Sequence, residues 1–302
     1  MKMPAIMKTQ ILTFLPIICI ASITGIQAHE FSDDRKGLSS NEYTLLLEPS
    51  HITDIRNGST QFLEIANELL QTANTGARIQ LDFEGAKTRR TRYLDTRDFD
   101  LFQNGYLVKE KLDLDETESA DARSKVSLNY RSKNWNESKS KNVEARLLTG
   151  EMKASPQKLE CEVSPKTTMF SHSSAIRFRK KDYRIDTFSA LSNLFPGLMK
   201  AKINSKAAIL PVNNFEPVET VVPGVIHFED GDKIRMRLVF WQREQDGKSF
   251  NMAEFSMYFS QKSVRKKPEI AGKAKELFKS LRKHDWRALK QDGKGAIAYK
   301  AE

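Results

Sequence analysis

Cysteine, glycine and proline are all scarce in this chain of 302 residues, which contains 2 Cys, 14 Gly and 10 Pro. So few cysteines exclude a disulfide-stapled fold, and so little glycine and proline excludes a collagen-like or low-complexity chain. The five histidines offer no pair at zinc-ligand spacing, and no Walker-type glycine loop occurs. Beyond the first 28 residues there is no long apolar run, which argues against a multipass membrane protein. The length permits one large domain or two small ones.

The N-terminus has the pattern of a secretory signal peptide. Lys2 and Lys8 precede an apolar run over residues 11–26, and Ala28 provides a small residue at the boundary. The sequence therefore predicts a signal peptide over residues 1–28 and a mature chain of residues 29–302, periplasmic or secreted, with no transmembrane anchor. An uncleaved N-terminal anchor is the alternative. Cleavage leaves Cys161, which we interpret as a small core residue.

The chain is basic, with 49 Lys and Arg against 39 Asp and Glu and a formal net charge of +10. Removal of the predicted signal peptide still leaves a clear excess of cations. An exported protein with this charge favours polyanions or anionic surfaces as partners. No motif predicts a specific nucleic-acid partner.

Polar and apolar residues alternate in many short segments, which predicts an α+β fold: a mainly antiparallel β-barrel or tunnel with covering helices. The expected strands lie at 42–48, 78–83, 106–112, 125–131, 158–164, 175–183 and 253–261. A further strand follows 78–83 and ends at Tyr93, and a hairpin is expected over 225–242 with its turn at 230–232. One helix is expected to begin after an N-cap at Ser59 and to end at Gly76, and others are expected at 98–104, 189–199 and 268–283. Residues 131–157 are expected to cross the surface, and residues 262–267 to form a solvated basic loop.

Charges of one sign share a face on several of these strands, because side chains two residues apart point the same way. The cationic faces carry Lys109 with Lys111, Arg177 with Arg179 and Lys181, and Arg235 with Arg237; the acidic faces carry Glu160 with Glu162, and Glu254.

Two interpretations of these faces are open. They could be the solvated side of a half-buried antiparallel sheet, or they could line the interior of a closed barrel whose apolar outer faces are covered by helices. A cationic interior suits a chain of phosphates, which Lys and Arg bind by charge-assisted hydrogen bonds. Carboxylates opposite them are the ligands that Mg²⁺ or Mn²⁺ prefer, and such an ion would orient water for attack on a phosphoryl group.

The run from Arg92 to Lys111 resembles the signature of the CYTH superfamily, the triphosphate tunnel enzymes. That signature has an aromatic residue, an Asp-Thr pair, a leucine, a glycine and a basic-x-basic strand in this order. Here these are Tyr93, Asp95-Thr96, Leu101, Gly105, and Lys109 with Lys111. Further weak matches follow in family order along residues 42–261, and the C-terminal segment completes the expected domain over residues 29–302.

The resemblance implies an eight-stranded antiparallel tunnel and the family's chemistry on triphosphates, nucleotides or polyphosphate. It also implies roles for the charged faces. The implied phosphate-binding residues are Lys109, Lys111, Arg177, Arg179, Arg235 and Arg237, and the implied ligands of Mg²⁺ or Mn²⁺ are Glu160, Glu162, Glu254 and Glu42.

The chain departs from the family pattern at two positions. The opening Glu-x-Glu-x-Lys motif is reduced to Glu42, and Asn129 stands where a lysine is common. Loss of a metal carboxylate could end catalysis and leave anion binding intact. Three hypotheses follow: a metal-dependent triphosphate or polyphosphate hydrolase, a noncatalytic protein of the same fold that binds an anion or a partner, and an unrelated β-sandwich. The sequence does not determine the ligand or the oligomeric state.

Overall fold

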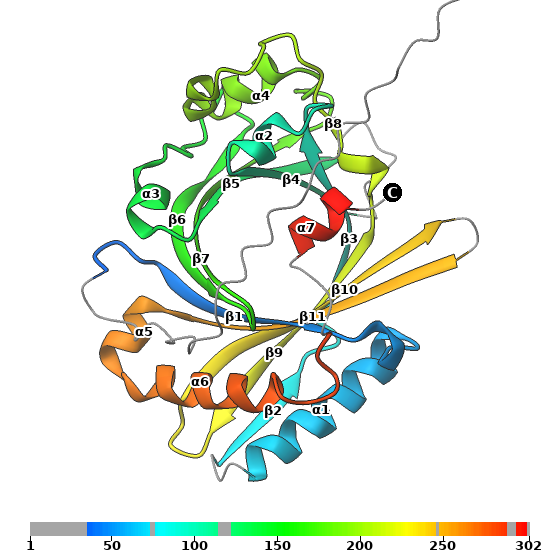
Figure 1. Ribbon diagram of the computed structural model, residues 1–302, viewed down its shortest axis with the longest axis vertical. Helices are drawn as coiled ribbons and strands as arrows, with labels where there is room; N and C mark the ends of the chain where they lie inside the picture. Colours follow the sequence, from blue (N-terminus) through cyan, green and yellow to red (C-terminus); the bar gives the residue numbers. More distant parts are fainter. Residues whose placement is uncertain (1–34, 73–75, 114–121, 246–247, 289–293, 301–302) are drawn as a thin grey trace, which may run out of the picture. The chain divides into compact units, whose positions relative to one another are not determined.

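The computed structural model describes residues 35–72, 76–113, 122–245, 248–288 and 294–300 (Figure 1). The chain divides into two units, residues 1–36 and 37–302, and the second unit contains the fold. The predicted signal peptide lies outside the described residues. None of the helices in the described ranges combines the length and apolar character needed to cross a bilayer.

One sheet of eleven strands runs through the described part of this unit, and nine of its strands close into a ring (Figure 1). The ring order is β9-β10-β11-β1-β6-β7-β5-β4-β3, and β3 pairs back to β9. The strands are β1 (Ser40–Leu47), β2 (Ala77–Leu81), β3 (Lys87–Asp95), β4 (Tyr106–Asp113), β5 (Arg123–Ser132), β6 (Lys153–Val163), β7 (Thr168–Arg179), β8 (Leu210–Pro211), β9 (Val218–Phe228), β10 (Lys233–Gln245) and β11 (Lys248–Ser260).

The ring closes through a short seam between β3 and β9. Residues 87–90 of β3 pair with residues 218–221 of β9, and the other end of β9 pairs with β2. This closure confirms the predicted mainly antiparallel barrel and excludes the β-sandwich. Two details differ from the expected tunnel. The ring has nine strands rather than eight, and β1 pairs with β6 in parallel, an arrangement that the long stretch of chain between them permits.

The outer face of the ring at β1, β10 and β11 is apolar and packs against two helices. Tyr43 of β1 contacts Phe278 of α6 (Glu269–Leu281), with ring centroids 4.9 Å apart. Phe62 of α1 (Ile55–Thr72) contacts Phe255 of β11 at 5.2 Å. Burial of these side chains supplies the hydrophobic stabilisation of this half, at about 25 cal/mol per Å² of apolar surface.

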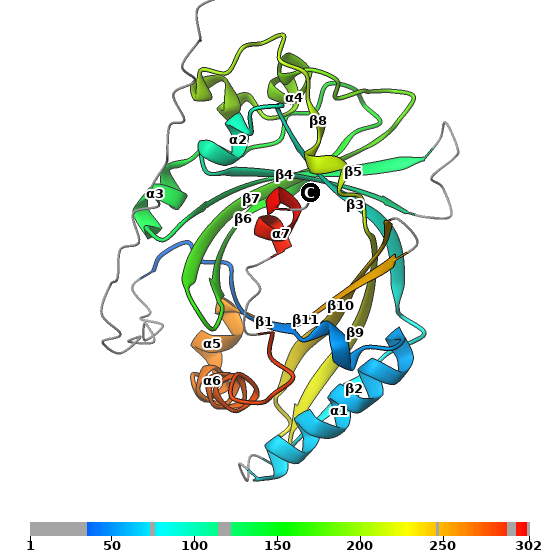
Figure 2. The same cartoon turned by 45° about the vertical axis from the view of Figure 1, so that its right-hand side comes forward.

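A second core covers the outer faces of β4, β5 and β7. It is formed with α4 (Phe188–Leu194) and the 3₁₀ helix η3 (Pro196–Ala201). The short helices α2 (Asp100–Gln103) and α3 (Trp135–Ser140) lie on the same side (Figure 2). Fully buried members include Val108, Val126, Leu128, Ile176, Leu191 and Phe195. Since the apolar residues of these strands face outward, their alternate residues must face the ring interior.

The C-terminal helix α7 (Lys294–Lys300) lies inside the ring in both views (Figures 1 and 2). The Tyr299 hydroxyl donates a hydrogen bond to Asp95 Oδ2 at 2.7 Å, and its ring stacks on Phe102 with centroids 4.2 Å apart. Asp95 is buried and also accepts backbone N–H bonds from residues 96, 101 and 102. The Asp-Thr pair of the signature therefore joins β3 to α2 and α7.

Four predicted element boundaries are corrected by the structure. Helix α1 begins at Ile55 because Asp54 accepts a hydrogen bond from the backbone N–H of Asn57, and Ser59 is buried inside the helix. The helix expected over 189–199 ends at Leu194 because Pro196 follows it. The expected basic loop forms α5 (Gln261–Lys266), with Ser260 as its N-cap. Strand β6 begins at Lys153, within the segment expected to cross the surface.

Candidate functional site

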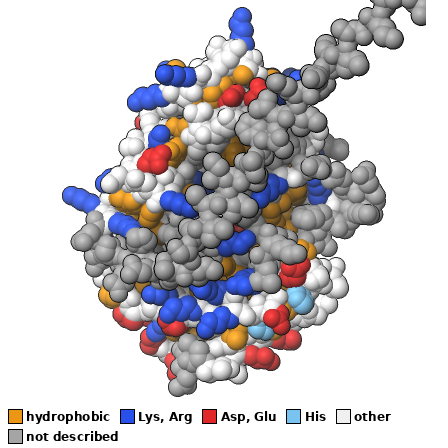
Figure 3. Space-filling model, in the orientation of Figure 1, with side chains coloured by type: hydrophobic (Ala, Val, Ile, Leu, Met, Phe, Trp, Pro, Cys, Tyr) orange, Lys and Arg blue, Asp and Glu red, His pale blue; other side chains and the backbone are white. Residues whose placement is uncertain are grey.

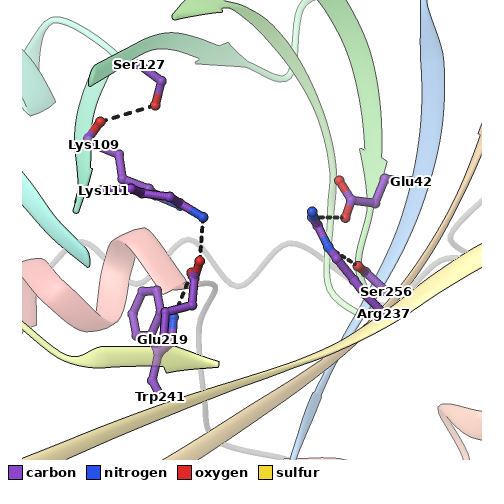
Figure 4. Close-up of polar contacts among 8 residues, drawn as sticks. All are labelled: Glu42, Lys109, Lys111, Ser127, Glu219, Arg237, Trp241 and Ser256. Atoms are coloured by element: carbon purple, nitrogen blue, oxygen red, sulfur yellow. Dashed lines mark hydrogen bonds and ion pairs between the residues drawn. The ribbon is translucent and has the colours of Figure 1, made fainter. Parts of the chain in front are cut away.

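The ring interior contains a cavity of about 510 Å³, within the range of small-molecule sites. Its described lining combines cations and carboxylates from separate walls of the ring (Figure 4). The cations are Lys109 of β4, Arg131 of β5, Arg237 of β10, Lys166 and Arg287; the carboxylates are Glu42 of β1, Glu162 of β6 and Glu254 of β11.

Arg237 is fixed at the floor of the cavity by two side chains. Its Nη2 donates to Glu42 Oε1 at 2.7 Å, and its Nε donates to Ser256 Oγ at 2.9 Å (Figure 4). The nearby charge of Glu42 is the main cause that raises the pKa of Arg237, with Glu254 and Glu219 adding to it against the effect of burial. Arg237 is therefore permanently charged, and its guanidinium geometry suits phosphate oxygens.

Lys109 faces Arg237 from the opposite wall (Figure 4). Burial lowers the pKa of its amine, and the charges of Glu219 and Glu254 oppose that effect. Its Nζ lies 5.1 Å from the ring centroid of Tyr93, and it forms no ion pair with any described residue. An unpaired, desolvated ammonium inside a cavity is an anion-binding group, because a bound anion supplies the missing charge.

Lys111 belongs to the same strand face, and its side chain reaches past β3 to β9. Its Nζ pairs with Glu219 of β9, whose other oxygen accepts from Trp241 Nε1 at 3.0 Å (Figure 4). Glu219 is 1 % exposed and Trp241 is fully buried. Sequence reasoning missed Glu219, since the hairpin was expected to begin at Val225. A single acid within the run Val218–Val222 was the signal that could have identified it.

Arg131 is the second residue of the site that sequence reasoning missed. It was predicted as the last residue of a strand, but β5 continues to Ser132 and Arg131 forms an ion pair with Glu162 of β6. The spacing of Lys125, Ser127, Asn129 and Arg131 could have identified it, because all four share the inner face.

The predicted metal ligands lie on three strands of the ring, and Glu42 of β1 stands directly opposite Glu162 of β6. Glu42 and Glu162 are each held by an arginine, and Glu160 accepts a hydrogen bond from Ser40 Oγ at 2.7 Å. Glu254 is buried in the cavity wall at 3 % exposure. In the described ranges, no three His, Cys, Asp or Glu side chains gather closely enough to share an ion. The donor set in this arrangement does not fit a divalent metal, which needs several oxygen ligands around one point.

Four of the six predicted phosphate-binding residues, Lys111, Arg177, Arg179 and Arg235, lie outside the cavity lining. Arg177 and Arg235 are exposed. Arg179, at the end of β7, forms ion pairs with Glu151 at 2.8 Å and Asp182 at 3.2 Å. Lys109 and Arg237 line the cavity, and Lys111 lies two residues from Lys109 on the same face.

A further basic surface lies outside the ring. On the face seen in Figure 3, Lys and Arg side chains gather in the region where Figure 1 places α5 and α6. Lys262, Arg265 and Lys266 of α5 are exposed. This surface accounts for part of the net positive charge independently of the cavity.

Comparisons with known proteins identify similar solved structures. Neither a protein-family model nor a curated protein matches the sequence. The adenylyl cyclase candidate HpAC1 from Hippeastrum, described as having a dominant triphosphatase activity, matches with a TM-score of 0.42 and 13 % identity over 86 % of this chain and 95 % of that one. A candidate adenylate cyclase from Bacillus halodurans matches with a TM-score of 0.38 and 10 % identity over 83 % of this chain and 92 % of that one. The chain itself has the closed strand ring with charged interior faces that its resemblance to the CYTH superfamily implies.

Proposed function

We propose that this chain is an exported tunnel protein that binds a phosphate-rich anion inside its strand ring. One observation carries the proposal: Lys109, Arg131 and Arg237 come from three different strands and line one cavity. Lys109 has no ion-pair partner among the described residues, so an anion would complete its environment. The resemblance of Arg92–Lys111 to the triphosphate tunnel signature supports a phosphate chain as that anion.

The geometry favours binding over hydrolysis as the primary activity. Two of the four carboxylates that the resemblance assigns to Mg²⁺ or Mn²⁺, Glu42 and Glu162, are engaged by Arg237 and Arg131. In this arrangement Glu42 and Glu162 hold the guanidinium groups in the cavity until an anion replaces them as partners. Metal-dependent hydrolysis of triphosphate or polyphosphate stays a prediction from the resemblance, and a divalent ion enters the test below as a separate arm.

The first test measures the melting temperature of the protein with tripolyphosphate, with sulfate as the reference anion and with and without Mn²⁺. We expect tripolyphosphate to raise the melting temperature more than sulfate without added metal, because a ligand of the folded state stabilises it by mass action. Glu42→Gln should increase this shift, since it frees Arg237 for the anion. Glu151→Gln, which removes an exposed carboxylate from another arginine, should leave the shift unchanged.

The same experiment separates the two functions. A tripolyphosphate shift that requires Mn²⁺ and disappears in Glu42→Gln would assign Glu42 to a metal site and favour the hydrolase. A shift no larger than that of sulfate in the wild-type protein would remove the proposed function.

Anion affinity should fall as pH rises through the lowered pKa of Lys109, below the usual lysine value of 10.5. The charged amine binds the anion and the neutral amine does not, so deprotonation removes one cation from the cavity. The check is the dissociation constant of tripolyphosphate between about pH 7 and pH 10. Lys109→Gln should bind more weakly and lose this part of the pH dependence; an identical pH profile in both proteins would contradict the role of Lys109.

Export is the remaining part of the proposal and rests on the signal-peptide pattern of residues 1–28. Expression of the full sequence should yield a secreted or periplasmic chain whose first residue lies within a few positions of His29. A chain recovered with Met1 intact would contradict cleavage.

A further inference from the structure

Four cations stand directly opposite one another on four neighbouring strands of the ring. Lys111 of β4 faces Lys125 of β5, Lys125 faces Arg177 of β7, and Arg177 faces Lys153 of β6. Residues directly opposite on paired strands share a face, so this cationic row lies on the same face as Lys111. Neighbouring strands are about 4.8 Å apart, and the row therefore extends over about 14 Å.

The row continues from the cavity toward solvent. Lys109 lines the cavity and lies two residues before Lys111 on β4. Lys111 and Lys125 are half-buried, while Arg177 and Lys153 are exposed. A ligand held at Lys109 can therefore reach the row without leaving this wall of the ring.

Most of the row has no neutralising carboxylate in the described part of the chain. Lys111 pairs with Glu219, but no ion pair among the described residues includes Lys125, Arg177 or Lys153. Burial lowers the pKa of Lys125, and Arg177, Arg89, Lys158 and Lys109 lower it further. Like charges placed directly opposite on a sheet destabilise it, so an extended anion along the row would relieve an existing repulsion.

The neighbours of the row favour a bare phosphate chain over a nucleic acid. The adjacent row on the same face of β5, β7 and β6 consists of Ser127, Ala175 and Ser155. Proteins that bind single-stranded nucleic acids combine cations with aromatic platforms for the bases. These described positions provide small side chains and no aromatic ring.

We propose that the cationic row Lys111, Lys125, Arg177 and Lys153 is a second anion-binding station, which makes the tunnel select linear polyphosphate longer than a triphosphate. The inference rests on the proposed function, because the inner end of the chain occupies the cavity at Lys109 and Arg237. Linking two stations by one ligand raises affinity by making the second contact intramolecular.

The test compares the affinities of tripolyphosphate and of linear polyphosphate with about fourteen phosphates, a chain long enough for both stations. The double variant Lys125→Gln/Arg177→Gln is measured beside the wild-type protein. The matched control is Lys200→Gln/Lys206→Gln, which removes the same charge from two exposed positions outside the ring. Each phosphate ligand is compared between the three proteins. This cancels the gain in affinity that a longer phosphate chain has from its larger number of equivalent binding positions.

We expect the wild-type protein and the control to bind the longer chain at least about tenfold more tightly than tripolyphosphate. The double variant should reduce this preference to about threefold or less, while melting no lower than the wild-type protein at low salt because a repulsion has been removed.

Two outcomes would overturn this inference and leave the proposed function standing: tripolyphosphate binds but the longer chain binds no more tightly, or the double variant keeps the full preference. A single-stranded oligonucleotide of matched charge that shows the same dependence on the row would overturn the assignment to bare phosphate chains. Binding of neither phosphate ligand by the wild-type protein would refute the proposed function itself.

Discussion

Replacement of Arg237 by glutamine is expected to weaken tripolyphosphate binding at least about 30-fold, the loss expected when one partner of a hydrogen-bonded charge pair is truncated at an interface. Arg237 brings a permanent charge to the cavity, held by Glu42 at 2.7 Å and Ser256 at 2.9 Å. Glutamine keeps part of the length and the hydrogen-bonding capacity but not the charge or the two-pronged geometry. Isothermal titration at constant salt and pH provides the measurement.

Arg235→Gln is the matched control for this experiment. Arg235 lies two residues before Arg237 on the same strand and shares its face, but it is exposed and is not among the residues that line the cavity. Its replacement should change affinity less than about threefold, as expected for a solvated charge. Equal losses in both variants would mean that the anion is attracted by the general charge of β10 and not bound by the cavity.

Glu219→Ala is expected to cost about 3–5 kcal/mol of folding stability, which corresponds to a fall in melting temperature of about 10 °C. The substitution leaves the indole N–H of Trp241 without its acceptor in a fully buried position and removes the counter-ion of Lys111. Removing the Trp241 indole N–H and the Lys111 ammonium from water carries a desolvation cost, and the Glu219 carboxylate offsets it. Thermal denaturation of the unliganded protein measures the effect.

The control for stability is Glu160→Ala, the same substitution on another inner strand face. Glu160 is half-buried and accepts a hydrogen bond from Ser40 Oγ. We expect it to cost about 1 kcal/mol. If Glu219→Ala had the same melting temperature as the wild-type protein, Glu219 could not be the group that holds Lys111 and Trp241 in place.

The architecture of the ring could be predicted because alternation at period two is a local property. Lys109 and Lys111 opposite Val108 and Leu112 already divide β4 into a charged and an apolar face. The apolar face carries enough hydrophobic area to require covering helices, which leaves the charged face for the interior. The same reasoning placed Arg237 correctly opposite Met236 and Leu238.

Depth within the ring could not be predicted, because it depends on register between strands distant in sequence. Arg177 and Arg235 have the same local pattern as Arg237, but pairing places them at exposed positions. The pairing of Arg131 with Glu162 likewise requires β5, β7 and β6 to be aligned. Glu219 and Arg131 were missed because the strand ends differ from the expected ones. Strand β9 begins before Val225 and so includes Glu219, and β5 ends beyond Arg131.

The pairing of β1 has a consequence for how the protein folds. Residues 40–47 of β1 pair with residues 253–260 of β11, so the first and last strands of the ring must meet before the wall is complete. Such non-local contacts slow folding, and a chain still lacking β11 leaves β1 with an open edge. The contact of Glu42 on β1 with Arg237 on β10 depends on this pairing, because β11 lies between the two strands. A phosphate chain bound between Lys109 and Arg237 would bind the finished ring more tightly than its precursors, and would therefore stabilise the completed fold by mass action.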